Sequence, residues 1–309
     1  MLKQFEAILM LGYGGPEKPE DIPPFLQNVA KGRPIPADRL KEVAHHYELI
    51  GGKSPLNEFT YKQAQGLENY LAEKGHSLPV FVGMRNWHPL IPDTLNKMSD
   101  SGVKKAIGMI MAAHQSDASW ERYQRDVHEA LEETGVQMEF IYSPPLFNHP
   151  LFIENSADRV AECLEQIPES ELDETMILFS AHSIPTPMAE SSPYVEQLTT
   201  SSKLIAERLG FSNWRLVYQS RSGRPSDPWL EPDVCDVIHE IAVEGVRNVV
   251  VQPIGFICDH VEVLFDIGIE AAQAAKEEGI KLLRANTVND DPKFIAAMGD
   301  AVLKITDKS

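Results

Sequence analysis

Short apolar runs alternate with longer stretches in which apolar residues recur at helical spacing, and this alternation extends along the whole chain. The short runs are rich in β-branched residues, which is typical of strands buried on both faces of a sheet. Eight such strands are predicted, at residues 7–11, 80–84, 106–111, 138–142, 175–180, 214–218, 248–252 and 281–284. Helical spacing predicts helices at residues 58–74, 151–166, 194–209, 233–244, 261–278 and 291–305, and a further helix that ends at 134.

The pattern restarts after the proline-containing segments 143–145 and 148–150. Four predicted strands precede this point and four follow it. Strands that alternate with helices predict parallel sheets with helices on both faces, so we expect two doubly wound α/β domains, residues 1–145 and 146–309. We expect that the last helix of the second domain is able to pack against the first domain.

Ligands of such domains bind beyond the carboxyl ends of the strands, so the turns that follow the strands are candidate sites. Four turns qualify, at residues 12–15, 112–116, 180–185 and 253–262. The first is rich in glycine, but it is not the dinucleotide motif G-x-G-x-x-G, and Pro16 disrupts the helix start that a pyrophosphate would need. The chain also lacks a Walker loop, an H-E-x-x-H motif and the G-x-S-x-G elbow of hydrolases.

Two of these turns carry groups that suit a metal ion. His182 lies just past a predicted strand, and the turn at 253–262 supplies Asp259, His260 and Glu262. A lone histidine is more often a structural hydrogen-bonding group than a ligand, but an imidazole and a carboxylate at two strand ends can meet. Such a nitrogen–oxygen pair suits a transition metal held loosely as a substrate, and a neutral His182 could also accept protons.

Three acids follow in the predicted helix at 261–278. Glu262, Asp266 and Glu270 stand at positions i, i+4 and i+8, which places them on one face of an α-helix. Like charges stacked in this way repel each other, so the row is unfavourable for a purely structural helix. A cation that moves along the row would explain it.

Composition restricts the classes of protein that remain. The net charge of −18 opposes a nucleic-acid surface and gives no attraction to anionic lipid. No apolar run approaches the ~20 residues that span a membrane, and the N-terminus lacks the pattern of a signal peptide, so we expect a cytoplasmic protein. The three cysteines, Cys163, Cys235 and Cys258, are far apart and support neither a disulfide framework nor a zinc or iron–sulfur site.

Several tyrosines and other polar residues could contact a planar or carboxylated ligand. Tyr13 stands in the glycine-rich turn, where a phenol could ligate iron or stack on a ring, or merely cap the edge of the core. Four further groups could bind carboxylates, although each alone is typical of an ordinary surface: His46, Tyr47, Ser54 and Tyr123.

Six motifs together resemble the ferrochelatases in order and spacing over nearly the whole chain. They are residues 50–56, 180–185, 218–220, 228–233, 253–256 and 259–266. The resemblance implies a chelatase-like fold of two Rossmann-like domains with a cleft between them. It also implies a lyase of haem biosynthesis that inserts Fe²⁺ into a porphyrin and releases two protons.

By position, His182 and Glu262 resemble the catalytic and metal-binding pair of that family. The resemblance implies that His182 accepts pyrrole protons or hands over the metal, and that Glu262 binds iron and passes protons outward. It likewise assigns Glu262, Asp266 and Glu270 to a metal-binding acidic path.

The same resemblance favours coproporphyrin III over protoporphyrin IX. Coproporphyrin enzymes of the family carry a tyrosine in the first glycine-rich turn, so Tyr13 would be an axial ligand of the product iron. His46, Tyr47, Ser54 and Tyr123 would contact propionates. The chain departs from the family where Ala30, near Lys31 and Arg33, and His46 replace arginines, so the propionates need other cationic partners.

Expectations about cofactors and partners follow from the same resemblance. Some similar actinobacterial enzymes hold a [2Fe–2S] cluster, but this chain lacks their C-terminal cysteines, so we expect no cluster and no tightly bound cofactor besides the Fe²⁺ substrate. The expected partners are the porphyrin, ferrous iron and a haem-receiving enzyme, with no nucleic acid, no integral membrane segment and a monomeric state.

Three other functions stay open. The chain could prefer protoporphyrin IX, or it could insert cobalt or nickel, because a histidine–glutamate pair does not by itself select the ion. It could also be a non-catalytic haem- or porphyrin-binding protein, although a carrier has no need for the acidic row.

Overall fold

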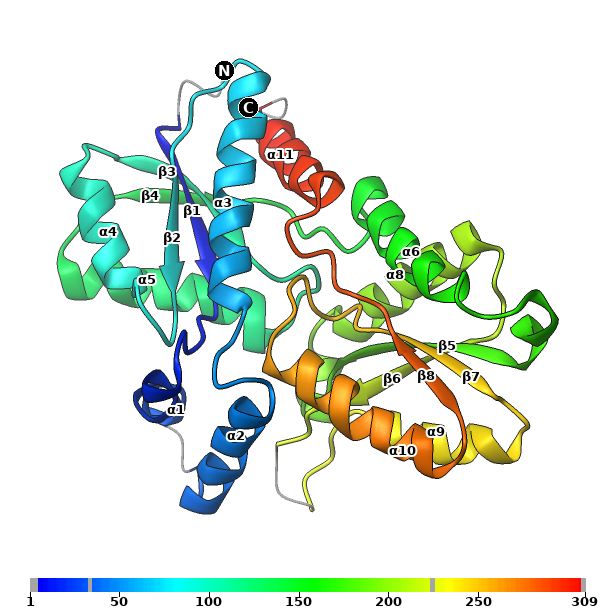
Figure 1. The fold of residues 1–309 in the computed structure, drawn as a ribbon. Helices are drawn as coiled ribbons and strands as arrows, with labels where there is room; N and C mark the ends of the chain where they lie inside the picture. Colours follow the sequence, from blue (N-terminus) through cyan, green and yellow to red (C-terminus); the bar gives the residue numbers. More distant parts are fainter. Residues whose placement is uncertain (1–4, 33–34, 223–225, 307–309) are drawn as a thin grey trace. The chain divides into compact units, whose positions relative to one another are not determined.

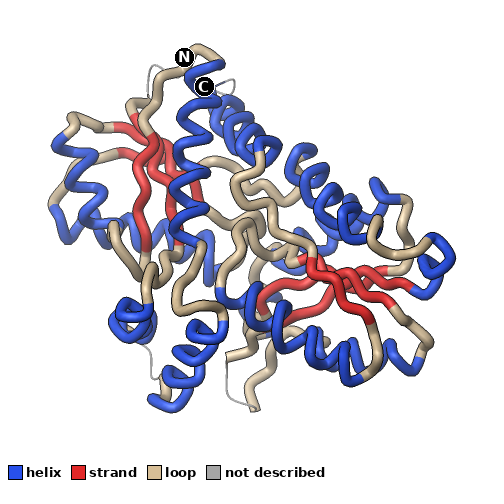
Figure 2. Tube along the Cα trace, viewed as in Figure 1, coloured by secondary structure: helices blue, strands red, loops and turns tan. Residues whose placement is uncertain are grey.

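The computed structural model describes residues 5–32, 35–222 and 226–306, and internal contacts group the chain into two compact units (Figure 1). Unit 1 comprises Met1–Ala112, Asp117–Leu146 and Asp290–Ser309. Unit 2 comprises Ala113–Ser116 and Phe147–Asn289. Each unit holds one sheet between helices (Figure 2).

Unit 1 is built on a four-stranded parallel sheet with the strand order β2-β1-β3-β4. The strands are β1 (Ala7–Gly12), β2 (Val80–Met84), β3 (Lys105–Ile110) and β4 (Glu139–Tyr142). The helices are α1 (Ile22–Ala30), α2 (Ala37–Leu49), α3 (Leu56–Glu73), α4 (Ile91–Asp100), α5 (Arg122–Thr134) and α11 (Pro292–Thr306). A short 3₁₀ turn, η2 (Pro19–Asp21), and a π-helix, η3 (Asp117–Glu121), complete the unit.

The core of unit 1 lies between the sheet and the helices α4 and α5. Leu9 and Leu11 of β1 are fully buried against Leu95 of α4 and Val127 of α5. Helix α11 packs on α3, as Figure 1 shows. Their contact includes a hydrogen bond of 2.9 Å from the Tyr70 hydroxyl to Asp300 Oδ1.

Unit 2 repeats the architecture with the strand order β6-β5-β7-β8, again all parallel. The strands are β5 (Thr175–His182), β6 (Trp214–Gln219), β7 (Asn248–Gln252) and β8 (Lys281–Arg284). The helical segments are α6 (Pro150–Leu164), the 3₁₀ turn η4 (Glu169–Glu174), α7 (Thr186–Glu190), α8 (Tyr194–Leu209), α9 (Val234–Val243), the π-helix η5 (Glu262–Ala271) and α10 (Ala272–Glu277).

The two faces of this sheet are covered by different helices. Leu178, Val217 and Val251 point to the face on which α9, η5 and α10 pack, and together they form the buried core of the unit. Helices α6 and α8 pack against each other and against β7 and β6 on the other side (Figure 1). Since side chains alternate along a strand, each strand contributes to both layers.

The structure confirms the predicted α/β class, with eight strands close to their predicted bounds. Three differences concern helices, and the short helix α7, which was not predicted, is one of them. Helix α4 was not predicted, although Pro92 in its first turn and the spacing of Ile91, Leu95 and Met98 are helical signals. The predicted helix at 261–278 is a π-helix followed by a short α-helix, a distinction that apolar spacing cannot make.

Among the described residues, no helix combines the length and the apolar character that a membrane span requires. Arg33, which the sequence analysis named as a charged residue near Ala30, lies outside the described residues.

Candidate functional site

His182 is the last residue of β5, and hydrogen bonds fix its orientation. Its Nδ1 donates to the carbonyl oxygen of Ser183, and the Tyr194 hydroxyl donates to the carbonyl oxygen of His182 over 3.1 Å. Because Nδ1 carries the proton in this arrangement, the neutral ring presents the lone pair of Nε2. The side chain is 30% exposed, so that nitrogen is accessible to a ligand.

Glu262 is the first residue of η5, and its carboxylate lies between two imidazoles. Its Oε1 is 3.6 Å from Nε2 of His182, and its Oε2 is 3.4 Å from Nε2 of His260. His260 is oriented as His182 is, because its Nδ1 donates to the carbonyl oxygen of Cys258 over 3.1 Å and its ring packs on Phe256. Sequence reasoning noted His260 in the turn but assigned it no place in the site.

These three side chains are nitrogen and oxygen donors of the kind that divalent transition metals prefer. The separations of 3.4 and 3.6 Å are longer than well-formed hydrogen bonds, so the carboxylate is not locked to either ring. Within the described residues, no group of three or more such side chains is already arranged as an ion site. The structure therefore brings the predicted pair together as neighbouring donors.

The turn before η5 is placed by a close backbone approach. The Gly255 amide donates to the carbonyl oxygen of Ser180 over 3.1 Å, and a Cβ at Gly255 would lie 2.7 Å from the Cβ of Ala181. Only glycine fits there, so the glycine lets the turn that carries Glu262 lie against the strand that carries His182.

Asp259 holds the same turn and does not join the donors. Its Oδ1 accepts hydrogen bonds from Arg284 Nη1 over 3.1 Å and from Thr287 Oγ1 over 3.2 Å. Its Oδ2 accepts from Asn289 Nδ2 over 3.3 Å. The sequence could not separate Asp259 from Glu262, because the partners of Asp259 are 25 to 30 residues away along the chain.

The three predicted acids do not share one environment. Glu262 is half-buried, Asp266 is 8% exposed and Glu270 is exposed. The segment is a π-helix, in which hydrogen bonds reach five residues along the chain instead of four, and the charges of Glu262 and Glu270 both act on Asp266. The middle acid of the row is thus the most buried one, and the last is exposed.

Burial of Asp266 raises the pKa of its carboxyl to about 7, and the neighbouring charge of Glu262 acts in the same direction. A hydrogen bond from the Ser220 hydroxyl to Asp266 opposes this effect. Ser220 has a φ of 62°, a left-handed conformation that directs the chain beyond β6. Asp266 can therefore gain and lose a proton near neutral pH.

In unit 1, Tyr13 follows β1 in the glycine-rich turn and is 40% exposed. Its carbonyl oxygen accepts a hydrogen bond of 3.1 Å from the Asn86 amide, and its ring lies edge-on to Phe25. At the next residue, Gly14 has a φ of +81°, and a Cβ there would lie 2.9 Å from the Cβ of Trp87. The turn after β1 is thus packed against the turn after β2.

Arg85 links two of the predicted tyrosines. Its guanidinium carbon lies 5.8 Å from the centre of the Tyr13 ring and 5.3 Å from that of Tyr123, within cation–π range. Its Nε is 2.7 Å from Asp126 Oδ2, and its side chain is only 10% exposed. Sequence reasoning missed Arg85, although a charged residue directly after a buried strand is a signal for a site.

Burial raises the pKa of the Tyr123 hydroxyl above its ordinary range, so this group stays protonated as a potential hydrogen-bond donor. Tyr47 is also buried and lies edge-on to Phe25, the ring that Tyr13 contacts. The structure therefore brings Tyr13, Tyr47 and Tyr123 together around the end of β1.

Ser54 lies against the turn after β1, whereas His46 stands on α2 next to Tyr47 in the chain. The Ser54 amide donates to the carbonyl oxygen of Pro16 over 2.8 Å, and its Cβ would contact a Cβ at Gly15 at 2.8 Å. His46 is half-buried, and burial, followed by the charge of Arg39, lowers its pKa. A histidine of lowered pKa is neutral at pH 7, so it does not replace the permanent charge of an arginine.

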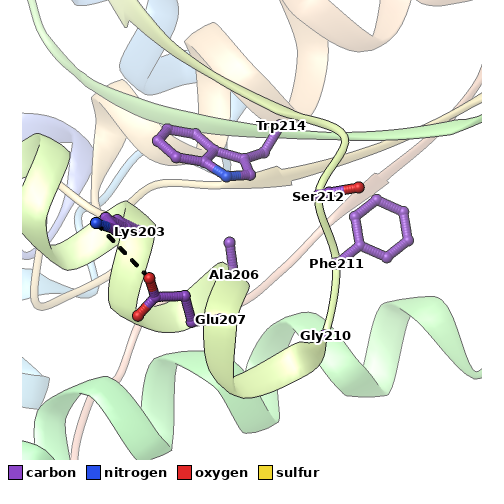
Figure 3. A pocket seen from close by; sticks show the side chains of 7 residues that line it. All are labelled: Lys203, Ala206, Glu207, Gly210, Phe211, Ser212 and Trp214. Carbon is purple, nitrogen blue, oxygen red and sulfur yellow. Dashed lines mark ion pairs between the residues drawn. The ribbon is translucent and has the colours of Figure 1, made fainter.

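A cavity of about 390 Å³ lies elsewhere on unit 2, between the end of α8 and the start of β6 (Figure 3). It is lined by Lys203, Ala206, Glu207, Gly210, Phe211, Ser212 and Trp214. Trp214 is the first residue of β6, at its amino end, whereas His182 is the last residue of β5, at its carboxyl end. The cavity is therefore separate from the donor pair.

Comparison with known proteins places these features in context. A family model described as Ferrochelatase matches residues 5–305. The coproporphyrin III ferrochelatase of Streptomyces coelicolor is 42% identical, over 97% of this chain and 85% of the relative. That of Mycolicibacterium smegmatis is 40% identical, over 96% of this chain and 89% of the relative. The ferrochelatase of Rhodopirellula baltica is 40% identical, over 95% of this chain and 84% of the relative.

Solved structures show the same fold at low sequence identity. SirB from Bacillus subtilis with Fe³⁺ aligns with a TM-score of 0.60 and 13% identity, over 97% of this chain and 95% of that chain. The sirohydrochlorin chelatase SirB from B. subtilis subspecies spizizenii in complex with cobalt gives 0.58 and 11%, over 97% and 94%. At such identity the likeness concerns the fold alone.

Proposed function

The chain belongs to the ferrochelatase family, and on this premise we propose that it inserts Fe²⁺ into coproporphyrin III and releases two protons. Membership confirms the class of enzyme that the motifs predicted, a lyase of haem biosynthesis that inserts metal into a porphyrin. One observation carries the proposal at the level of residues. An imidazole nitrogen and a carboxylate, His182 Nε2 and Glu262 Oε1, lie 3.6 Å apart at adjoining strand ends.

The proposed role of His182 follows from its hydrogen bonds. Since Nδ1 donates to Ser183, Nε2 is free to accept a proton from a pyrrole nitrogen. Glu262 supplies the negative charge that binds Fe²⁺, and Nε2 of His260 lies 3.4 Å from the second oxygen of that carboxylate as a further nitrogen donor. Insertion exchanges two pyrrole protons for one divalent ion, so the two protons must leave the site.

Asp266 and Glu270 are proposed to take part in that departure, and with Glu262 in metal binding. A carboxyl whose pKa is about 7 exchanges protons readily near neutral pH, and Asp266 lies along η5 between half-buried Glu262 and exposed Glu270. The most buried of the three acids, Asp266, thus lies between the donor pair and the exposed Glu270.

Tyr13, His46, Tyr47, Ser54 and Tyr123 are proposed to bind the porphyrin, with the Tyr13 phenol as axial ligand of the product iron. The grouping of the three tyrosines around Phe25 and Arg85 supports a shared role for them. Relatives that carry the coproporphyrin name support the choice of substrate. Arg85 lies beside two of these rings and is paired with Asp126, and its permanent charge suits a carboxylated ligand better than neutral His46 does.

We also propose that the protein acts in the cytoplasm as a monomer, passes its product to a haem-receiving enzyme and holds no [2Fe–2S] cluster or other tight cofactor. The acidic composition and the wide separation of the three cysteines support these statements. Sedimentation velocity and the iron and sulfide content of the purified protein test the monomer and the cluster.

The decisive experiment is anaerobic addition of Fe²⁺ to the enzyme with coproporphyrin III or protoporphyrin IX, followed by the loss of the free-porphyrin spectrum. We expect faster insertion into coproporphyrin III. Faster insertion into protoporphyrin IX would overturn the substrate, and binding without insertion would leave a porphyrin carrier. Parallel assays with Co²⁺ and Ni²⁺ test the alternative ions.

A further inference from the structure

Gln219, the last residue of β6, connects the two elements that carry the donor pair. In the sheet it is the direct partner of His182 on β5, and it is only 1% exposed. Its side-chain Nε2 donates a hydrogen bond to the backbone carbonyl oxygen of Glu262, the first residue of η5. The side-chain amide of Gln219 therefore joins the end of β6, beside His182, to the first residue of η5, Glu262.

Sheet geometry explains why this contact forms. Paired residues of parallel strands point to the same face, so Gln219 and His182 share the face that carries Leu178 and Val217. Ile267 and Ala271 of η5 pack on that face, which brings the start of the π-helix over the strand ends. The next residue, Ser220, donates to Asp266 and so secures η5 a second time.

We propose that Gln219 is a positioning residue that sets the distance between His182 and Glu262 and thereby the affinity of the site for Fe²⁺. The inference rests on the proposed function, in which these two side chains form the metal pair. Gln219 does not contact the metal or the porphyrin in this role. It acts through the backbone of Glu262.

A second observation separates this role from ordinary packing. Gln219 Oε1 and Ser180 Oγ are buried and have no hydrogen-bond partner among the described residues. A buried oxygen without a partner is unfavourable for stability, and a methionine would fill similar space without that penalty. Stability alone therefore explains a glutamine at this position poorly. Its hydrogen bond to the Glu262 carbonyl oxygen gives an explanation.

The chain offers a matched control on the neighbouring strand. Gln252, the last residue of β7, is also 1% exposed and also has a side-chain oxygen without a partner in the described structure. It pairs with Phe179, so it points to the opposite face of the sheet from His182 and η5. Gln252→Met repeats the chemical change without touching the donor pair.

The test compares Gln219→Met with Gln252→Met in three measurements: equilibrium Zn²⁺ binding to the porphyrin-free enzyme, the KM values for Fe²⁺ and porphyrin, and the thermal midpoint. For Gln219→Met we expect roughly tenfold weaker Zn²⁺ binding and a raised KM for Fe²⁺, because the donor that fixes Glu262 is lost. The KM for porphyrin and the thermal midpoint should not worsen. Gln252→Met should bind Zn²⁺ as the wild type does.

His182→Ala and Glu262→Gln complete the design. If both bind Zn²⁺ weakly while Gln219→Met binds normally, the positioning role is wrong and the proposed metal pair stands. If both bind as tightly as the wild type, the metal pair itself is wrong. Should Gln219→Met fail to fold, Gln219→Leu also removes the donor, and normal Zn²⁺ binding by it would equally overturn the inference.

Discussion

The carboxyl ends of the two sheets are built from different chemistry on the same topology. Both sheets order their strands as second, first, third and fourth in the chain. In unit 2 the strand ends carry imidazoles and carboxylates that are oriented by hydrogen bonds to the backbone. In unit 1 they carry aromatic rings around Phe25 and one buried cation, Arg85.

Under the proposed function, this difference lets one scaffold support two tasks. Imidazole and carboxylate need a defined direction, because metal binding and proton transfer depend on a lone pair at a given place. Aromatic rings need area and close packing, which glycines at the turn after β1 allow. Unit 2 therefore suits the ion and its protons, and unit 1 suits a flat ligand.

The strongest test of this division is His182→Ala, which removes the proposed proton acceptor from unit 2. We expect kcat for Fe²⁺ insertion to fall by about 10²- to 10⁴-fold, the range for loss of a general base, with porphyrin affinity little changed. His239→Ala is the control, because His239 also pairs with a glutamate, Glu278 at 2.8 Å, but on the surface. Normal turnover by His182→Ala would remove the proposed role.

A second test uses the pH dependence of Asp266. Its folded pKa of about 7 lies above the ordinary value of 3.8, so the folded state binds the proton more tightly than the unfolded state does. Stability should therefore fall as pH rises from about 4 to 7 and stay low above that range.

Asp266→Asn removes this titration, so it should be more stable than the wild type at pH 8, by on the order of 3 kcal/mol, and similar to it near pH 4. Thermal or urea unfolding at both pH values measures the difference. Glu270→Gln, at the exposed end of the same segment, should show no such pH-dependent gain. Equal effects of the two variants would contradict the gradient of burial along η5.

The smallest expected effect concerns unit 1. Tyr13→Phe keeps the ring against Phe25 and the cation–π contact with Arg85 but removes the hydroxyl. We expect kcat to change only a few-fold, because the proton acceptor lies in unit 2, while the absorption spectrum of bound product haem should shift with loss of the axial phenol. Tyr61→Phe, another exposed tyrosine of unit 1, is the control. An unchanged spectrum would exclude Tyr13 as the axial ligand.

Much of the fold was predictable because buried parallel strands are marked by local sequence. The β-branched run at 248–252 is an example, since β7 has these bounds. Helix α4 was missed although its signals were present. The π-helical form of η5 could not be predicted, because it depends on how the segment packs on the strands and not on its own apolar spacing.

The site residues also include some that the sequence could indicate and others that it could not. His182 and Glu262 could be proposed because their motifs are local and distinctive, and their proposed roles stay predictions. Gln219 and Arg85 could not be ranked from sequence, since their importance comes from partners 43 residues away in one case and about 40 to 70 residues away in the other. Without the family resemblance, which points to Glu262, the local sequence does not distinguish Asp259 from Glu262, and the distant hydrogen-bond partners of Asp259 show the difference.

The packing of α11 on α3 bears on how the chain acquires its structure during translation. Unit 1 draws residues from both sides of unit 2, so a ribosome completes all of unit 2 before it makes α11. The second sheet and its helices can thus form on the nascent chain while the surface of α3 that receives Ile295 and Gly299 is still uncovered. Of the two units, unit 1 is therefore the later one to be completed, even though β1 precedes every strand of unit 2.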